Sequence, residues 1–115
     1  MGFLANVFAK GTSTAEAVDV SEAQRRQRAG TLIVDVREPE EWREGHVAGA
    51  RHIPLGALTA RLAELPRDQE ILTICRSGNR SGKAQSFLQG QGFSTVRNVS
   101  GGIIAWERAG LPVQR

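Results

Sequence analysis

The most informative stretch of the sequence is Glu70-Ile71-Leu72-Thr73-Ile74-Cys75-Arg76-Ser77-Gly78-Asn79-Arg80-Ser81, which contains the only cysteine of the chain. Its first five residues are mostly apolar and partly β-branched, a pattern typical of a strand buried on both faces of a parallel sheet, and Cys75 is expected to end this strand. Small residues and glycine follow, and a helix is predicted from Ser81 to about Gln91, terminated by Gly92. A buried strand therefore runs through a short loop into a helix.

Strand-like and helix-like segments alternate on both sides of this stretch. Further strands are predicted at residues 17–20, 31–36 and 95–99, with a short one near 51–53. The helices predicted between them are residues 21–29 with Ser21 as N-cap, a short helix from Pro39, an amphipathic helix carrying Leu55, Leu58, Leu62 and Leu65, and a last helix opened by Ser100-Gly101-Gly102. This alternation predicts an α/β fold with a parallel sheet.

The chain has 115 residues, of which 40% are hydrophobic and 23% are charged, and this composition predicts one globular domain. We place the domain at residues 15–115, after an N-terminal leader (residues 1–14) that is either a short amphipathic helix or disordered. The leader lacks a secretory pattern, and no apolar run has the length of an integral membrane segment. Because a single cysteine cannot form an internal disulfide and fits a reducing compartment, a cytoplasmic location is expected.

The charge pattern favours small anions as ligands. The formal charge is +3, and the basic side chains are mostly arginines scattered along the sequence. Nucleic-acid-binding domains usually show a basic stripe with interleaved aromatic residues, whereas aromatic residues make up only 5% of this chain. Nucleic acid is therefore not expected as a partner, and neither a metal site nor a cofactor is predicted.

Cys75 is expected at the carboxyl end of its strand, where open parallel sheets bind their ligands. Ser77 and Gly78 allow the backbone to curl so that the N–H groups of residues 76–81 point inward and form a nest for an anion, for which the Cys75 thiolate is the nearest candidate. A free cysteine is only about 3% thiolate at pH 7. Lowering its pKa by about two units takes roughly 2.7 kcal/mol, which the N–H donors and the helix dipole can supply.

The side chains around the cysteine suggest further roles. Arg80 lies where the loop meets the helix and offers a fork of donors to an oxyanion, while Arg76 is equally consistent with recognition and with solvated surface charge. Ser81 is expected either to donate its hydroxyl to the bound group or to cap the helix. His46 and His52 have no spacing that ties them to the cysteine, and they are expected in turns or at the surface.

Three separated motifs stand out together. They are Asp35-Val36-Arg37 followed by Glu41-Trp42 and Gly45-His46; the loop Cys75-Arg76-Ser77-Gly78-Asn79-Arg80-Ser81; and Gly101-Gly102 followed by Trp106. In this order and spacing they make residues 18–113 resemble the single-domain rhodanese family, which is thiosulfate sulfurtransferase-like. The resemblance implies an α/β, rhodanese-like fold with a small, mainly parallel, five-stranded sheet flanked by helices on both faces. We interpret Asp35 and Arg37 as a buried polar pair that supports the site.

The resemblance also implies an activity. The enzyme would be a sulfurtransferase that moves sulfane sulfur from thiosulfate or a related donor to cyanide or a thiol, through a persulfide on the catalytic Cys75. The implied loop that binds substrate and persulfide consists of Arg76, Ser77, Gly78, Asn79, Arg80 and Ser81. The expected partners are a small anionic sulfur donor, a thiol or cyanide acceptor and a protein acceptor of sulfur. No cofactor is implied beyond the covalent persulfide.

Two alternatives remain open at the level of the sequence. A Cys-dependent phosphatase or arsenate reductase also places Cys and Arg around a curled loop, but such loops resemble this one with one more residue between the two. Here four residues separate Cys75 from Arg80, and the tighter ring suits one sulfur atom better than a tetrahedral oxyanion. Departure of an alkoxide would also benefit from a positioned acid. The second alternative is an interaction or sulfur-relay module that carries a persulfide to a dedicated partner without turnover.

Overall fold

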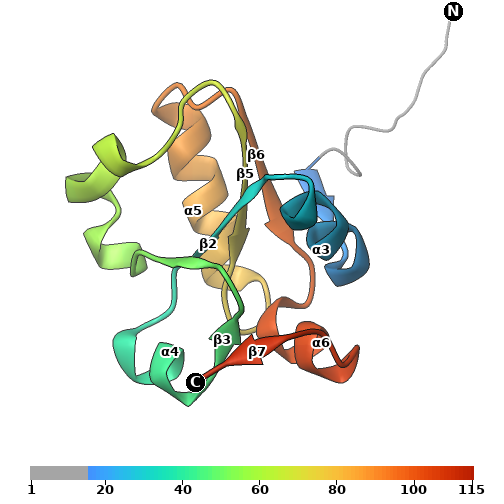
Figure 1. Ribbon diagram of the computed structural model, residues 1–115. Coiled ribbons are helices and arrows are strands. Elements are labelled where there is room, and N and C mark those ends of the chain that lie inside the picture. The colour runs from blue at the N-terminus through green and yellow to red at the C-terminus, as the bar shows by residue number, and fades with distance from the viewer. Residues whose placement is uncertain (1–15) are drawn as a thin grey trace, which may run out of the picture.

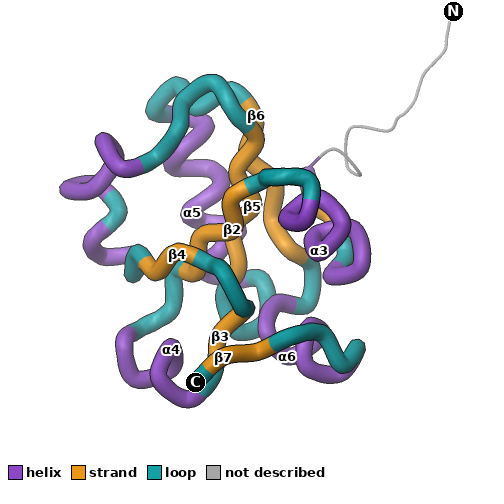
Figure 2. Tube along the Cα trace, viewed as in Figure 1, coloured by secondary structure: helices purple, strands orange, loops and turns teal. Residues whose placement is uncertain are grey.

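A parallel five-stranded sheet forms the centre of the structure, with the strand order β1-β6-β5-β2-β4 (Figures 1 and 2). The computed structural model describes residues 16–115, so the predicted leader lies outside the described residues. The strands are β1 (Ala17–Val18), β2 (Leu32–Asp35), β4 (Arg51–His52), β5 (Glu70–Ile74) and β6 (Thr95–Val99). All five predicted strands are confirmed, with ends that differ from the predicted ones by at most two residues.

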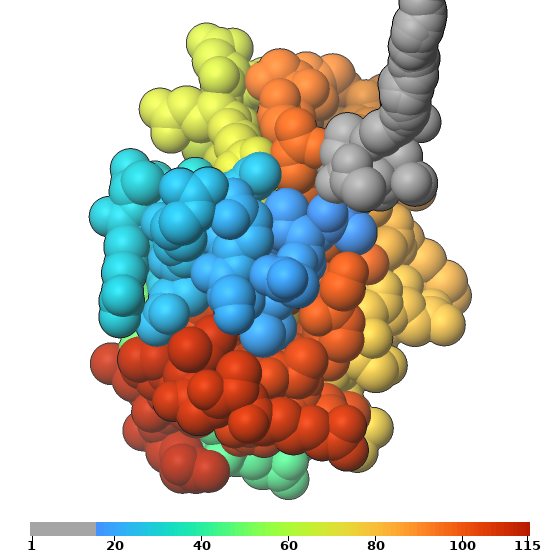
Figure 3. All heavy atoms as spheres, turned by 90° about the vertical axis from the view of Figure 1, so that its right-hand side faces the viewer, coloured from blue at the N-terminus to red at the C-terminus, as the bar shows by residue number. Residues whose placement is uncertain are grey.

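Helices cover both faces of this sheet, as predicted (Figure 1). One face carries α5 (Asn79–Gly90) and the short 3-10 segments η2 (Leu55–Ala57) and η3 (Thr59–Glu64), whereas the other carries α3 (Val20–Arg28) and α6 (Gly102–Arg108). The helices α3, in blue, and α6, in red, lie side by side in Figure 3. Among the described residues, no helix is long and apolar enough to cross a membrane.

The central strand β5 contributes side chains to both hydrophobic cores. Ile71 packs in the core beneath α5, and Leu72 and Ile74 pack in the core beneath α3 and α6. Successive strand residues point to opposite faces of a sheet, so Cys75 continues the series and belongs to the core on the α5 side. The thiol is therefore directed toward the face of the sheet that α5 covers.

The remaining elements lie beyond the carboxyl ends of the strands. The helix α4 (Pro39–Glu44) follows β2, and the strands β3 (His46–Val47) and β7 (Val113–Gln114) form a separate antiparallel pair. The helix from Pro39 was predicted, with proline in its first turn. The strands β3 and β7 were not predicted, because Gly45 and Gly49 frame β3 and Pro112 precedes β7, and such residues are typical of turns.

The predicted N-cap of the first helix is wrong. Asp19, and not Ser21, caps α3, because the Asp19 carboxylate accepts the backbone N–H of Glu22 at 2.8 Å. Aspartate is among the strongest N-caps, and this bond starts the helix at Val20. Ser21 is an exposed residue of the first turn.

The segment predicted as an amphipathic α-helix, residues 55–65, is also different. It forms the two 3-10 segments η2 and η3, and Arg61 has non-helical backbone angles (φ −119°, ψ 19°). Leu58 and Leu65 are nevertheless buried, and the other two leucines pack against the same core. Intervals of three and four residues fit either kind of helix, so the sequence predicted the apolar face correctly and the hydrogen-bond pattern wrongly.

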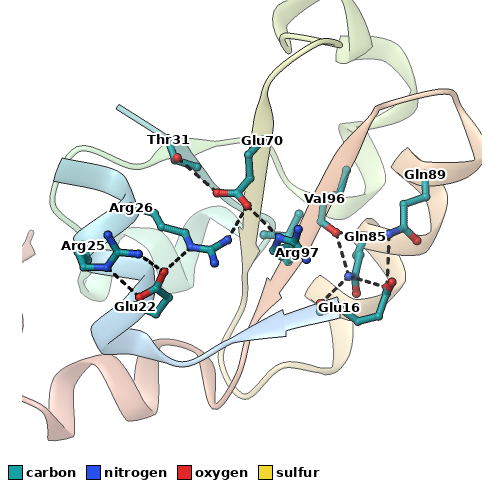
Figure 4. Close-up of polar contacts among 11 residues, drawn as sticks. Glu16, Glu22, Arg25, Arg26, Thr31, Glu70, Gln85, Gln89, Val96 and Arg97 are labelled. Atoms are coloured by element: carbon teal, nitrogen blue, oxygen red, sulfur yellow. Dashed lines mark hydrogen bonds and ion pairs between the residues drawn. The ribbon is translucent and has the colours of Figure 1, made fainter. Parts of the chain in front are cut away.

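A network of ion pairs lies at the amino end of β5, the end opposite to Cys75 (Figure 4). Glu70, the first residue of β5, accepts Arg26 Nη1 at 2.6 Å and Arg97 Nε at 2.9 Å. Arg26 also donates to Glu22, which in turn holds Arg25. These contacts join α3 to the sheet, and they occupy three of the arginines that give the chain its positive charge.

Candidate active site

Cys75 is the first residue after β5 and is only 1% exposed. Gly78 follows as the N-cap of α5, in the left-handed region with φ +115°. This conformation reverses the chain early and starts α5 at Asn79, two residues before the predicted start. Ser81 is therefore buried inside the first turn of the helix and does not cap it, so the predicted capping role of Ser81 is wrong.

Hydrogen-bond donors from the loop and from α5 surround the thiol. The Gly78 N–H lies 3.1 Å from the sulfur and the Ser81 hydroxyl lies 3.2 Å from it. Burial raises the pKa of Cys75, but the hydrogen bonds from the Ser81 hydroxyl and from the N–H groups of Ser81, Gly78 and Ser77 outweigh it, so the pKa lies below its ordinary value. Part of the nest expected from residues 76–81 is thus present around the sulfur.

This lowered pKa predicts a pH dependence. The thiolate is the reacting form of cysteine, so the rate of alkylation by iodoacetamide should fall as the pH drops through the lowered pKa of Cys75. We expect the midpoint of the rate profile below the value of about 8.5 for a free cysteine. The measurement is the loss of free thiol against pH in the folded protein, compared with the same protein in denaturant. Equal midpoints in the two states would contradict the hydrogen-bonded thiolate.

Arg80 is paired with Glu41 of α4. Its Nη1 and Nη2 donate to the two carboxylate oxygens at 2.6 and 2.8 Å. The hydrogen bonds from Arg80 lower the pKa of Glu41 to about 2, and the same contact raises the pKa of Arg80. From the sequence, the guanidinium donors of Arg80 were expected to bind an oxyanion. In the structure two of them donate to Glu41, and the binding of an oxyanion stays a prediction.

A cavity of about 280 Å³ lies between α4 and α6, beside the first loop residue. Its lining residues are Arg37, Glu41, Glu44, Gly45, Arg76, Ile103, Ile104 and Glu107. Arg76 is exposed at its wall, and Ser77 and Asn79 are exposed on the loop. Within residues 16–115 none of these three side chains makes a hydrogen bond. The cavity therefore gives a small molecule access to the loop beside charged groups of both signs.

Asp35 and Arg37 form the predicted buried pair. Their exposed fractions are 0% and 4%, and Arg37 Nη2 donates to Asp35 Oδ2 at 2.8 Å and to the Gly45 carbonyl at 2.7 Å. The pair thereby fixes the segment between β2 and β3, and Arg37 forms part of the cavity wall. Its support of catalysis stays a prediction.

The two histidines were expected in turns or at the surface, and the structure places them, half-buried, in the short strands β3 and β4. His46 and His52 both stack on the Trp42 ring, with centroid distances of 3.5 and 4.7 Å. Their ring nitrogens lie 2.9 Å from the Trp42 carbonyl and 2.7 Å from the Arg37 carbonyl. They hold α4 in place and make no hydrogen bond to Cys75. In the described part of the chain, no three His, Cys, Asp or Glu residues are grouped to hold a metal ion.

Two contributions to the site were not predicted from the sequence. The first is Asn98 near the end of β6, which donates from Nδ2 to the Gly78 carbonyl at 3.0 Å and accepts the Ser81 hydroxyl at 2.6 Å. The second is the start of α6, where the N–H groups of Ile103 and Ile104 donate to the carbonyls of residues 75 and 76 at 2.9 and 3.2 Å. Polar residues at the ends of neighbouring parallel strands meet at one edge of the sheet, and this is the signal that could have identified Asn98.

Gly102, which precedes these N–H groups, shows why the motif Gly101-Gly102 needs a glycine at its second position. Gly102 has φ +58°, and a Cβ at this position would lie 2.4 Å from the carbonyl oxygens of both Cys75 and Arg76. The active-site loop therefore rests directly on the backbone of residue 102. Trp106 is 1% exposed and packs in the core, as predicted.

Comparison with known proteins agrees with this architecture. The family description "Rhodanese-like domain" matches residues 19–109. A sulfurtransferase from Allochromatium vinosum is 41% identical over 96 residues, covering 81% of this chain and 90% of that protein. Thiosulfate sulfurtransferase GlpE from Pseudomonas putida is 37% identical over 89 residues, covering 77% and 80%.

A solved structure agrees as well. The crystal structure of a rhodanese-related protein from Thermoplasma volcanium superposes with a TM-score of 0.79 at 33% identity, covering 86% of this chain and 97% of that one. The resemblance noted in the three sequence motifs is confirmed by the family match, by both relatives and by this fold. The chain belongs to the family of rhodanese-like domains.

Proposed function

We propose that the protein is a rhodanese-type sulfurtransferase that moves sulfane sulfur from thiosulfate or a related donor to cyanide or a thiol through a Cys75 persulfide. The observation that carries the proposal is the buried Cys75 sulfur, with N–H and O–H donors at 3.1 and 3.2 Å and a lowered pKa. The names of the two relatives, a sulfurtransferase and a thiosulfate sulfurtransferase, support the same reaction class.

The reaction balances without a proton donor. The Cys75 thiolate attacks the outer sulfur of thiosulfate, a new S–S bond forms, and the old S–S bond breaks with its electron pair leaving on sulfite. The loop N–H groups then hold the anionic outer sulfur of the persulfide. Cyanide attacks that sulfur, and the Cys75 thiolate leaves as thiocyanate forms. Both leaving groups depart as stable anions, which suits a loop in which no acidic side chain among the described residues hydrogen-bonds to Cys75.

The proposal is tested by separating the two half-reactions. Intact-mass measurement after incubation with thiosulfate should show the gain of one sulfur atom, and added cyanide should remove it with formation of thiocyanate. Protein whose single thiol has been alkylated is the control. No gain in mass and no thiocyanate would overturn the proposal, while a gain in mass with negligible turnover would favour a sulfur-relay module. Hydrolysis of an aryl phosphate in place of sulfur transfer would favour the phosphatase alternative.

The pairing of Arg80 leads to a prediction about donor binding. If Arg80 binds the anionic donor, Glu41→Gln should lower the KM for thiosulfate, because it frees the guanidinium and removes a negative charge from the cavity wall. We expect a change of roughly fivefold, since one unit charge a few ångströms away in water is worth about 1 kcal/mol. Arg80→Ala should raise the same KM. Initial rates of thiocyanate formation over a range of thiosulfate concentrations measure both changes.

Glu40→Gln is the matched control for this experiment, because Glu40 is an exposed glutamate of the same helix that does not line the cavity. Its KM should equal that of the wild type. If Glu41→Gln raised the KM as Arg80→Ala does, the ion pair would act by holding α4, and donor binding by Arg80 would be refuted.

A further inference from the structure

The Ser81 hydroxyl lies between two acceptors but has one proton to donate. Its oxygen is 3.2 Å from the Cys75 sulfur and 2.6 Å from Asn98 Oδ1. Ser81 is completely buried, so water does not supply an alternative partner. The hydroxyl can therefore donate a hydrogen bond either to Asn98 or to the sulfur, but not fully to both at once.

The orientation of the Asn98 amide is fixed by its second hydrogen bond. Nδ2 donates to the Gly78 carbonyl at 3.0 Å, which leaves Oδ1 to face Ser81. The Gly78 N–H is itself a donor to the Cys75 sulfur at 3.1 Å. Asn98 is therefore hydrogen-bonded to Gly78 and to Ser81, two of the residues that donate to the sulfur. Its backbone is held inside the sheet, since it pairs with Ala17 on one side and with Thr73 on the other.

We propose that Asn98 is a positioning residue for sulfur transfer. While Cys75 carries the persulfide, Asn98 Oδ1 accepts the hydrogen bond of the Ser81 hydroxyl. When Cys75 is a thiolate, the Ser81 hydroxyl donates to the Cys75 sulfur instead. This inference rests on the proposed function. In the thiolate the negative charge is on Cys75 Sγ, which is then a strong acceptor for the hydroxyl. In the persulfide the charge is on the outer sulfur, and the bonded Sγ becomes a weak acceptor. The hydroxyl then turns to Asn98, so Asn98 favours the loaded state over the free thiolate.

The charged groups of the loop and of the cavity beside it are the same in all variants used below, apart from the carboxylate that Asn98→Asp adds; its direct charge effect on Cys75 is present in both Ser81 backgrounds and cancels in the cycle. These groups are Arg76 of the loop, Arg80 of α5, Glu41 and Glu44 of α4, the Asp35–Arg37 pair after β2, and Glu107 of α6. The difference in the pKa shift of Cys75 between the two Ser81 backgrounds therefore reports hydrogen bonding from the Ser81 hydroxyl to the sulfur.

The first experiment is a double-mutant cycle on the pKa of Cys75, measured from the pH dependence of alkylation. Asn98→Ala removes the competing acceptor, so the Ser81 hydroxyl should turn to the thiolate and lower this pKa. It also releases the Gly78 carbonyl, but this second effect is the same in the Ser81→Ala background and cancels in the cycle. We expect the shift caused by Asn98→Ala to be more negative by about 0.4 to 1.1 pH units when Ser81 is present.

Asn98→Asp gives a second cycle with the opposite sign. A carboxylate at this position holds the Ser81 proton more strongly, so the pKa of Cys75 should rise more with Ser81 present than in the Ser81→Ala background. With two substitutions at position 98, the inference can still be tested if either Asn98→Ala or Asn98→Asp fails to fold. Thr95→Ala on the same strand and Ser86→Ala on the exposed side of α5 are matched controls that should leave the pKa unchanged. Equal shifts in the two backgrounds would overturn the inference.

The second experiment measures the loaded state directly. Wild type and Asn98→Ala are equilibrated with a fixed ratio of thiosulfate to sulfite, and the persulfide fraction is read from intact mass. We expect the ratio of persulfide to free protein to fall by about twofold to tenfold in Asn98→Ala. The same substitution should have no such effect in the Ser81→Ala background, and an unchanged ratio in both backgrounds would overturn the inference. A wild type that gains no sulfur would instead overturn the proposed function, whereas the alkylation cycle needs no sulfur transfer.

Discussion

Cys75→Ser should abolish the transfer of sulfur from thiosulfate to cyanide. The serine hydroxyl has a pKa far above that of a thiol, so the loop donors that lower the pKa of Cys75 cannot produce a nucleophile from it. Because the chain has no second cysteine, no other thiol can take over. We expect a loss of at least about 10³-fold in thiocyanate formation and no gain in mass with thiosulfate.

The same variant should remain folded, which separates loss of chemistry from loss of structure. A serine oxygen can accept the Gly78 N–H that now faces the sulfur at 3.1 Å, so we expect the free energy of unfolding to change by only about 1 kcal/mol. Thermal unfolding measures this change. Thiocyanate formation at the wild-type rate by a folded Cys75→Ser protein would refute the role of Cys75.

Gly102→Ala should damage both stability and activity. The added Cβ would lie 2.4 Å from the carbonyl oxygens of Cys75 and Arg76, and these carbonyls are held by the N–H groups of Ile103 and Ile104. The backbone at φ +58° costs about 1–2 kcal/mol for a residue with a side chain, and overpacking adds about 1–3 kcal/mol. We therefore expect a loss of about 2–5 kcal/mol in the free energy of unfolding. Displacement of the loop should reduce turnover by about 10²-fold.

Gly110→Ala separates the clash from the backbone strain. Gly110 follows the same helix and has φ +71°, but an added Cβ there meets no atom within 4 Å. This control should lose only about 1–2 kcal/mol of stability and keep its turnover. If Gly102→Ala and Gly110→Ala had the same free energy of unfolding in denaturant and the same turnover, the contact between Gly102 and the active-site loop would contribute to neither stability nor activity.

Local patterns predicted most of the fold. β2, β5 and β6 follow β-branched, apolar runs, and Pro39 with its acidic neighbours marks the start of α4. The failures occur where two local solutions are both allowed by the sequence, as in residues 55–65, or where an equally good cap lies nearby, as with Asp19. Hydrophobic spacing determines which side of a segment is buried, but it does not distinguish 3-10 from α-helical hydrogen bonding.

The contacts of the site were predicted where the residues are neighbours in sequence. Cys75 and the curl at Gly78 were identified from one short stretch. The partner of Arg80 lies on α4 and the partner of Ser81 lies on β6. The strand-end position of Asn98 indicates that it lies near the site, but its contact with Ser81, like the Glu41–Arg80 pair, depends on tertiary structure. Ser81 was interpreted as a helix cap because the helix was predicted to begin at Ser81, two residues after its actual start at Asn79.

The order of the segments along the chain also matters for when the thiol becomes reactive. During synthesis on the ribosome Cys75 emerges before Asn98 and before the N–H groups of Ile103 and Ile104, and β1 cannot pair until β6 has been made. Until those later segments arrive, Cys75 has the pKa of an unfolded cysteine, about 8.5, and is a weak nucleophile. The thiolate is therefore favoured only in the folded domain, and most Cys75 thiols in an incomplete chain stay protonated at pH 7.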